Sequence, residues 1–94
     1  MNKYKYRATT QFRRDLKLCK KRRYSLEKLT AAINLLLNDG CLPSSYKPHK
    51  LAGTMNGIWE CHIQSDWLLL WQQLDDELVM LMTRTGTHSD IFNK

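Results

Sequence analysis

The stretch GIWECHIQSDWLLLWQQLDDELVMLMTR, residues 57–84, decides the fold. It divides into three segments that have the patterns of β-strands, namely residues 57–63, 66–74 and 77–84. The first and third alternate apolar and polar side chains, while the second is mostly apolar, as in a central strand. Turns as short as Asp75-Asp76 separate them, so we expect antiparallel hairpins. Because side chains alternate along a strand, Glu60 and His62 are predicted to share one face of the sheet.

The residues that precede this stretch predict a short strand and two helices. Residues 3–8 suit a strand, and Thr9 or Thr10 can cap a following helix with the apolar stripe Phe12, Leu16 and Cys19. A second helix is predicted between Ser25, a good N-cap, and Gly40, a natural C-terminal stop. Its apolar stripe consists of Leu26, Leu29, Ile33, Leu36 and Leu37.

This order of elements, β-α-α-β-β-β, predicts an α+β fold. The two helices are joined by a short connection, so we expect a helix hairpin on one face of a small, mainly antiparallel sheet. The other face would be available for a ligand. A chain of 94 residues suits one domain over residues 1–94. Residues 41–56 have the composition of a loop that is long for a small domain, and long ordered loops are often functional.

Positive charge is concentrated in the first quarter of the chain. Residues 1–24 carry ten lysines and arginines against a single acid, Asp15, and the net charge of the chain is +6. Such a cluster suits a polyanion, most simply nucleic acid. A solvated helix face, a membrane surface or a calmodulin-type partner would accommodate the same residues.

The cysteines and the hydropathy pattern indicate the cellular compartment. The three cysteines, Cys19, Cys41 and Cys61, are odd in number, and no pair has the spacing of a metal site. The first residues lack the apolar segment of a signal peptide, and the longest apolar run, residues 67–71, is too short to span a membrane. We therefore expect a cytoplasmic protein that does not associate with membranes.

Three histidines are the candidate reactive groups. His49, His62 and His88 can exchange protons near neutrality, because the ordinary pKa of histidine is about 6.5. Together with Asp66 and Arg84 in a basic domain, they indicate acid–base chemistry on a phosphate. No pair of histidines has close zinc-ligand spacing, so neither a metal nor another cofactor is expected.

Residues 46–92 resemble the YafQ group of RelE-type toxins, part of the RelE/ParE superfamily of bacterial type II toxin–antitoxin systems. The motifs that carry the resemblance are Tyr46-x-x-His49-x-Leu51-x-Gly53, Gly57, His62-Ile63, Asp66-Trp67-Leu68-Leu69 and the long block RTGTHSDIF, residues 84–92. The N-terminal half matches only in its pattern of a strand and two helices. Relatives often carry arginine at the position of Trp59 and tyrosine at that of Trp71.

The resemblance implies a ribosome-dependent endoribonuclease, or mRNA interferase, that cleaves mRNA in the A site and so inhibits translation. RNA can be cut without a metal, because its own 2′-OH attacks the phosphate. We expect Asp66, His62 or both to act as base, and His88 as acid, with His49 assisting or replacing it. Arg84 would bind the scissile phosphate. The expected substrate contacts are Lys47, Lys50, Trp67 and Phe92, the last by stacking on a base.

The resemblance also implies partners. These are mRNA, the 70S ribosome and a cognate antitoxin, usually a small acidic ribbon-helix-helix protein, with operator DNA reached only through the antitoxin complex. The basic residues expected to contact ribosomal RNA are Arg13, Arg14, Lys17, Lys20, Lys21, Arg22 and Arg23. Two alternatives remain open on sequence grounds: a non-catalytic inhibitor of the same fold, such as a gyrase poison, and an inactive corepressor that acts with its antitoxin.

Overall fold

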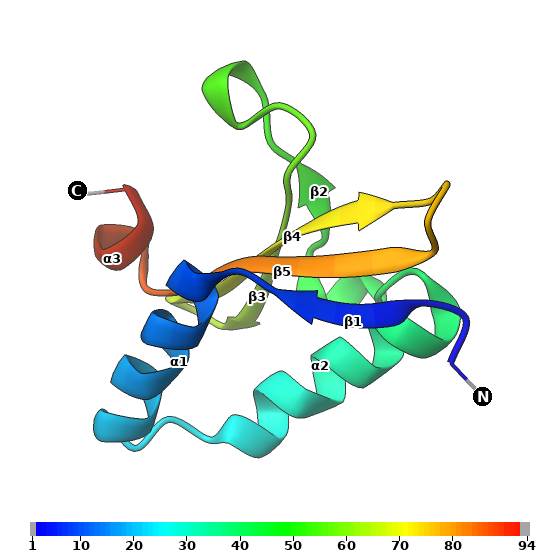
Figure 1. Ribbon diagram of the computed structural model, residues 1–94. Helices are drawn as coiled ribbons and strands as arrows, with labels where there is room; N and C mark the ends of the chain where they lie inside the picture. Colours follow the sequence, from blue (N-terminus) through cyan, green and yellow to red (C-terminus); the bar gives the residue numbers. More distant parts are fainter. Residues whose placement is uncertain (1, 93–94) are drawn as a thin grey trace.

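A five-stranded mixed sheet lies at the centre of the computed structural model, which describes residues 2–92 (Figure 1). The strands are β1 (Lys5–Ala8), β2 (His49–Lys50), β3 (Trp59–Gln64), β4 (Trp67–Leu74) and β5 (Val79–Gly86), in the spatial order β1-β5-β4-β3-β2. The helices are α1 (Thr10–Lys21), α2 (Leu26–Asp39) and α3 (His88–Phe92). Strand β1 pairs in parallel with β5, and the other neighbouring pairs are antiparallel.

The predicted order of strands and helices is confirmed, and two short elements are added to it. The two-residue strand β2 lies within residues 41–56, where a loop was expected, together with the 3₁₀ turns Ser44–Tyr46 (η1) and Gly53–Met55 (η2). Helix α3 follows β5. Neither element is long enough to produce a periodic pattern of side chains, which is why the sequence did not indicate them.

Helix α1 begins, and helix α2 begins and ends, where the predicted capping residues lie. The Thr9 hydroxyl accepts a hydrogen bond from the backbone N–H of Phe12, which caps α1. Gly40 ends α2 in the left-handed conformation with φ of 73°. A Cβ atom at Gly40 would lie 2.8 Å from the Tyr4 ring, so only glycine fits there.

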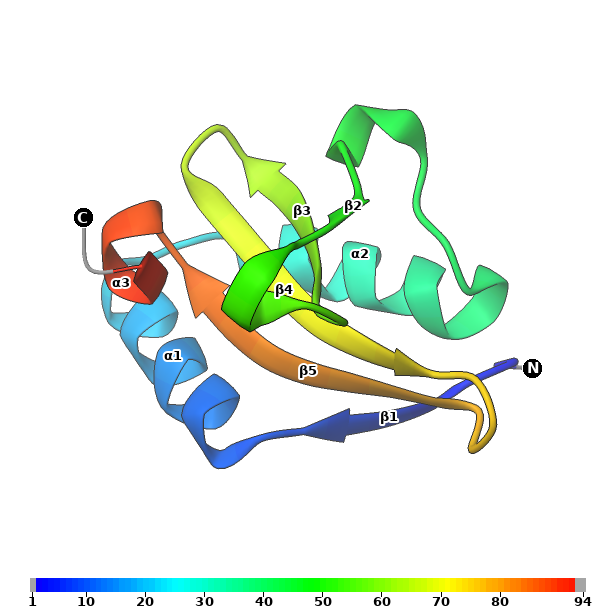
Figure 2. The same ribbon diagram turned by 90° about the horizontal axis from the view of Figure 1, so that it is seen from above.

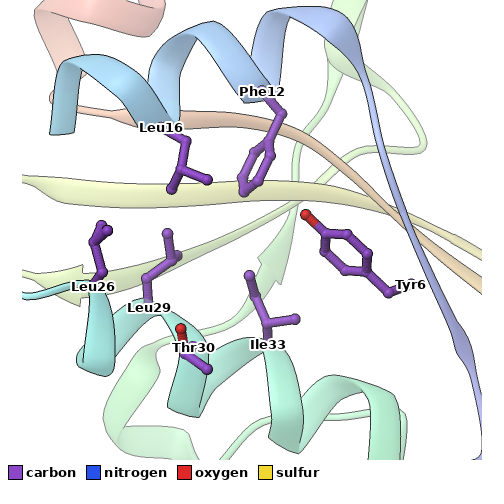
Figure 3. A pocket seen from close by; sticks show the side chains of 7 residues that line it. All are labelled: Tyr6, Phe12, Leu16, Leu26, Leu29, Thr30 and Ile33. Carbon is purple, nitrogen blue, oxygen red and sulfur yellow. The ribbon is translucent and has the colours of Figure 1, made fainter. Parts of the chain in front are cut away.

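Helices α1 and α2 cover one face of the sheet, as predicted (Figures 1 and 2). They diverge from their connection, however, so the hairpin is splayed and not closely antiparallel. An open apolar groove of about 230 Å³ lies between them and β1 (Figure 3). Its lining residues are Tyr6, Phe12, Leu16, Leu26, Leu29, Thr30 and Ile33.

The main core lies between the helices and this face of the sheet. Its largest fully buried side chains include Phe12, Leu36, Trp67 and Trp71. Two of the cysteines, Cys19 and Cys61, are buried, and Cys41 is exposed. Burial raises the pKa of the Cys61 thiol to about 12, which keeps it protonated and unreactive.

Helix α1 also continues the role of β1 along the edge of β5. The pairing of β1 with β5 ends at Ala8 opposite Met82. Beyond that point the Thr9 hydroxyl donates to the carbonyl of Thr83, and the Asp15 carboxylate accepts the backbone N–H of Thr85. Asp15 therefore stands in for a strand carbonyl and fixes α1 to the end of β5 where the candidate site lies.

Candidate functional site

The register of the strands gathers the predicted polar residues on the sheet face opposite α1 and α2. One row of paired residues runs from His49 through Glu60 and Leu70 to Arg84. The next row runs through His62, Leu68 and Gly86. Directly paired residues point to the same side of an antiparallel sheet. The "histidine face", defined by His49, Glu60, His62 and Arg84, thus has a floor of Leu68 and Leu70, both fully buried.

A sharp turn after β5 brings α3 over this face. Gly86 has φ of 149°, and a Cβ there would lie 2.8 Å from an Asp90 carboxylate oxygen. Thr87 and Asp90 form a reciprocal capping box: the Thr87 N–H donates to Asp90, and the Asp90 N–H donates to the Thr87 hydroxyl. The segment Thr87-x-x-Asp90 is the sequence signature of such a box. It fixes His88 as the first residue of α3.

His88 is held from two sides by Asp66. One oxygen of Asp66 accepts the backbone N–H of His88 at 3.0 Å and lies 2.7 Å from Nδ1 of its ring. These two hydrogen bonds lower the pKa of Asp66 below its ordinary value, so the carboxylate stays ionised. Because Nδ1 donates to Asp66, Nε2 is the ring nitrogen of His88 that remains for a substrate. A carboxylate that orients an imidazole in this way is a common arrangement for proton transfer.

Two further rings flank His88. The ring centroid of His62 lies 6.1 Å from that of His88, and the centroid of Phe92 lies 6.2 Å away. His62 comes from β3, His88 and Phe92 from α3, and Asp66 from the turn between β3 and β4. Four residues predicted from the sequence to act on RNA therefore lie together at one end of the histidine face.

His49 is paired with Glu60. Glu60 was predicted on the same face of the sheet as His62 but was not predicted as a site residue. Nε2 of His49 lies 3.1 Å from the Glu60 carboxylate, and Nδ1 lies 3.0 Å from the carbonyl of Lys47. A carbonyl only accepts, so Nδ1 donates to it, and the Nε2 edge of the ring faces the Glu60 carboxylate. Glu60 is buried, with 6% of its surface exposed.

Arg84 lies on the histidine face but is already engaged with Asp15. Its Nε donates to the Asp15 carboxylate at 2.7 Å, and its Nη2 donates to the same group and to the backbone carbonyl of Asp90. Nη1 takes no part in these bonds. A β-bulge in β5, between the pairs Leu70–Arg84 and Trp71–Met82, directs the side chain toward α1. Asp15 was missed, although it is the lone acid among ten basic residues and lies on the apolar side of its helix.

The basic residues of α1 and of the turn that follows it divide into two groups. Arg13, Arg14, Lys17, Lys20, Lys21 and Arg23 are exposed. Arg22 is also exposed but forms a two-pronged ion pair with Asp90 and thereby ties the end of α1 to α3. This ion pair keeps the pKa of Asp90 well below its ordinary value.

The residues expected to contact the substrate lie in different parts of the structure. The prediction that Trp67 contacts the substrate is wrong. Only 2% of its surface is exposed, and its indole N–H donates to the Thr85 hydroxyl. It lies in the core against Tyr24 and cannot reach a substrate. Lys47 is exposed beside His49, in the left-handed conformation with φ of 52°. Lys50 is exposed and lies over the Trp59 ring, on the far face of the sheet from His62.

Within residues 2–92, no three histidine, cysteine or acidic side chains are arranged as ligands of one metal ion. None of the helices in that range is both long and apolar enough to cross a membrane.

Comparison with known proteins places this chain and its fold among small bacterial toxins. Residues 4–93 match the family described as bacterial toxin of type II toxin–antitoxin system, YafQ. The mRNA interferase toxin YafQ of Escherichia coli K12 is 39% identical over 83 residues, which cover 87% of this chain and 88% of that protein. The chain belongs to the YafQ family of type II toxins.

Solved structures agree with this assignment. The crystal structure of the E. coli DinJ–YafQ toxin–antitoxin complex contains a chain that matches with a TM-score of 0.86 and 33% identity, over 96% of this chain and 98% of that one. A metal-bound toxin from Helicobacter pylori matches with a TM-score of 0.87 and 30% identity, over 95% and 99% of the two chains. Both show the same arrangement of helices on a sheet.

Proposed function

We propose that this toxin is a metal-independent endoribonuclease that cuts mRNA in the ribosomal A site and so stops translation. The observation that carries the proposal is the hydrogen-bonded pair His88–Asp66 next to His62 and Phe92. These groups supply two imidazoles, a fixed carboxylate and a ring that can stack on a base. The relatives named mRNA interferase support the same reaction.

The geometry favours a division of roles. Asp66 has a lowered pKa and both its hydrogen bonds go to His88, so it suits holding that ring better than accepting a proton. We assign His62 as the base that takes the proton of the 2′-OH, whose oxygen then attacks phosphorus. His88 gives a proton to the leaving 5′-oxygen as the P–O5′ bond breaks. The products are a 2′,3′-cyclic phosphate and a 5′-hydroxyl.

His49, in contact with Glu60, is a further imidazole on the same face. His49 is paired with Glu60, which lies two residues from His62 along β3. The Cα atoms of His49 and His62 are therefore diagonal neighbours, about 7–8 Å apart. We assign His49 to assist His88 or to protonate a phosphate oxygen. Nη1 of Arg84 would stabilise the negative charge on the reacting phosphate, while Asp15 holds the guanidinium in place.

The partners follow from charge and from the relatives. Exposed basic residues of α1 would contact ribosomal RNA phosphates and orient the toxin, without reading sequence. E. coli YafQ forms a complex with the antitoxin DinJ. A small acidic antitoxin of the ribbon-helix-helix type is proposed for this toxin, and operator DNA would be bound through that complex. Such a toxin would act in the cytoplasm, where ribosomes are.

The test is cleavage of a defined mRNA by the purified protein, with programmed 70S ribosomes and with free RNA in parallel. Cuts that need the ribosome, persist in a chelator and disappear in His88→Ala would support the proposal. The matched control is Asn34→Ala, an exposed residue of α2 on the other side of the sheet. Ends with 3′-hydroxyl and 5′-phosphate would rule out the 2′-OH mechanism. A folded protein that inhibits growth without cutting RNA would favour a non-catalytic inhibitor such as a gyrase poison.

A further inference from the structure

The edge of β3 beside His62 is left open by the short strand β2. The pairs His49–Glu60 and Lys50–Trp59 are the whole of the β2–β3 ladder. Beyond Glu60, β3 runs on to Gln64 with β4 on its other side. The turn η1 (Ser44–Tyr46) lies next to this part of β3. The result is a groove between η1 and the open edge of the strand.

Two adjoining cavities form this groove, and both reach His62. One has a volume of about 400 Å³ and the other about 340 Å³, and Ser45, His62 and Ile63 line both. The first is completed by Lys28, Ala31 and Tyr46, and the second by Lys47, Gln64 and Ser65. These volumes are in the range of pockets that bind small organic groups. The groove is thus continuous with the candidate site and ends at one of its histidines.

The lining of the groove has the chemistry to recognise a nucleotide. Ser45, Tyr46 and Ser65 carry hydroxyls, and Gln64 carries an amide with two donors and an acceptor. Lys28 and Lys47 bring positive charge, and no carboxylate lines either cavity. Among residues 2–92, the side chains of Gln64 and Ser65 form no hydrogen bond with the rest of the chain, and both are exposed. Their polar atoms are therefore available to a ligand.

The neighbours of His88 indicate which part of the RNA would enter the groove. Its ring has two ring neighbours, His62 with a centroid distance of 6.1 Å and Phe92 with one of 6.2 Å, and His62 lines the groove. A phosphate held at His88 would have Phe92 on one side and the groove on the other. A single strand that crosses the site would then stack one base near Phe92 and extend the neighbouring nucleotide along η1 toward Gln64.

We propose that this groove binds the nucleotide next to the scissile phosphate and that Gln64, with Tyr46 and Ser65, determines the base preferred there. The inference rests on the proposed endoribonuclease function and extends it to sequence selection. Recognition of unpaired RNA commonly combines an aromatic surface with hydrogen bonds to the edge of the base. Tyr46 is half-buried against the core, which keeps its ring fixed for such a contact.

The first test compares base preferences of variants. An mRNA pool with randomised nucleotides in and around the A-site codon is cleaved on 70S ribosomes, and the cut ends are sequenced. The variants are Gln64→Ala and Tyr46→Phe, and the control is Gln72→Ala near the other end of β4, outside both cavities. We expect one flanking position to lose roughly tenfold of its base preference in Gln64→Ala, as for a lost bidentate contact. Unchanged preferences in both variants would overturn the proposal while leaving the nuclease function intact.

The second test does not depend on cleavage. An mRNA with a 2′-O-methyl group at the cut site and 4-thiouridine on one side of it or the other is irradiated in the toxin–ribosome complex, and the cross-linked peptides are identified. Cross-links from one side to residues 44–47 or 61–65 support the groove, even if the wild-type protein cuts no RNA. Cross-links confined to residues 88–92, from both sides, overturn it.

Discussion

At the scale of single residues, Asp66 connects the turn after β3 to the reactive ring of His88. Replacement by asparagine keeps the size of the side chain but removes the charge from the group that accepts both hydrogen bonds of His88. We expect Asp66→Asn to lower single-turnover cleavage on ribosomes by about 100-fold, the lower end of a typical acid–base contribution, with little change in ribosome affinity. The matched control is Asp76→Asn, in the exposed turn between β4 and β5. Equal rates for the two variants would contradict the role of Asp66.

The site residues that were predicted can be recognised within one short segment of sequence, whereas those that were missed depend on contacts between distant segments. His62, His88 and Asp66 were found because histidines and a specific motif can be read directly. Asp15 and Glu60 were not assigned to the site, since their roles depend on partners far along the chain or on another strand, Arg84 and His49. Trp67 was wrongly expected to contact the substrate. The sequence of a strand does not show which face of the sheet the helices cover, and Trp67 lies on the covered face.

At the scale of elements, α3 holds His88 only if its own first turn is fixed, and Asp90 is the group that fixes it. Its lowered pKa means that the stabilisation is fully present above the ordinary aspartate value of about 3.9 and is lost as pH falls through the lower folded value. We expect Asp90→Asn to reduce Tm at pH 7 by about 5–10 °C, the loss of one charge-assisted network.

The difference in Tm between Asp90→Asn and the wild type should shrink as the pH is lowered from 4 toward 2. Thermal unfolding followed by circular dichroism at several pH values measures this, with Asp39→Asn at the end of α2 as a control. A difference in Tm that stays constant over this range would show that Asp90 does not act through its charge.

Strands β3 and β4 carry different functions on their two faces. Trp59 and Trp71 are directly paired and stacked, with ring centroids 5.9 Å apart and an angle of 12° between planes. Both lie on the core face, away from His62. We expect Trp59→Ala to lower the free energy of unfolding by about 2 kcal/mol, since Trp59 is only half-buried. The rate of RNA cleavage below the Tm should stay within about twofold, and a large loss of rate would place Trp59 in the site.

These elements also show where the sequence was sufficient. Periodic segments predicted β3, β5 and both long helices, because many side chains repeat the same signal, and a mostly apolar run predicted β4. Strand β2 has two residues, and its pairing with β3 is a long-range contact without a local pattern. The positions of His49 and Glu60 relative to each other therefore became visible only in the folded chain.

At the scale of the whole molecule, the basic charge of α1 and the histidine face lie on different parts of the surface but are joined by ion pairs. Asp15 binds Arg84, and Arg22 binds Asp90, so both contacts link α1 to the segment that carries His88. Phosphate contacts along α1 would thus orient the same rigid unit that presents His88. The free side chains best suited to such contacts are Arg13 and Lys17, four residues apart and exposed.

Each phosphate contact contributes roughly 0.7–0.9 to the slope of log affinity against log salt concentration, because counterions are released. We therefore expect Arg13→Glu with Lys17→Glu to reduce the slope for 70S binding by about 1.5 and to weaken binding most at low salt. The control is Lys3→Glu with Lys5→Glu, which makes the same change of net charge on and beside β1. Equal slopes for the two double variants would mean that α1 acts through net charge alone, without docking on RNA.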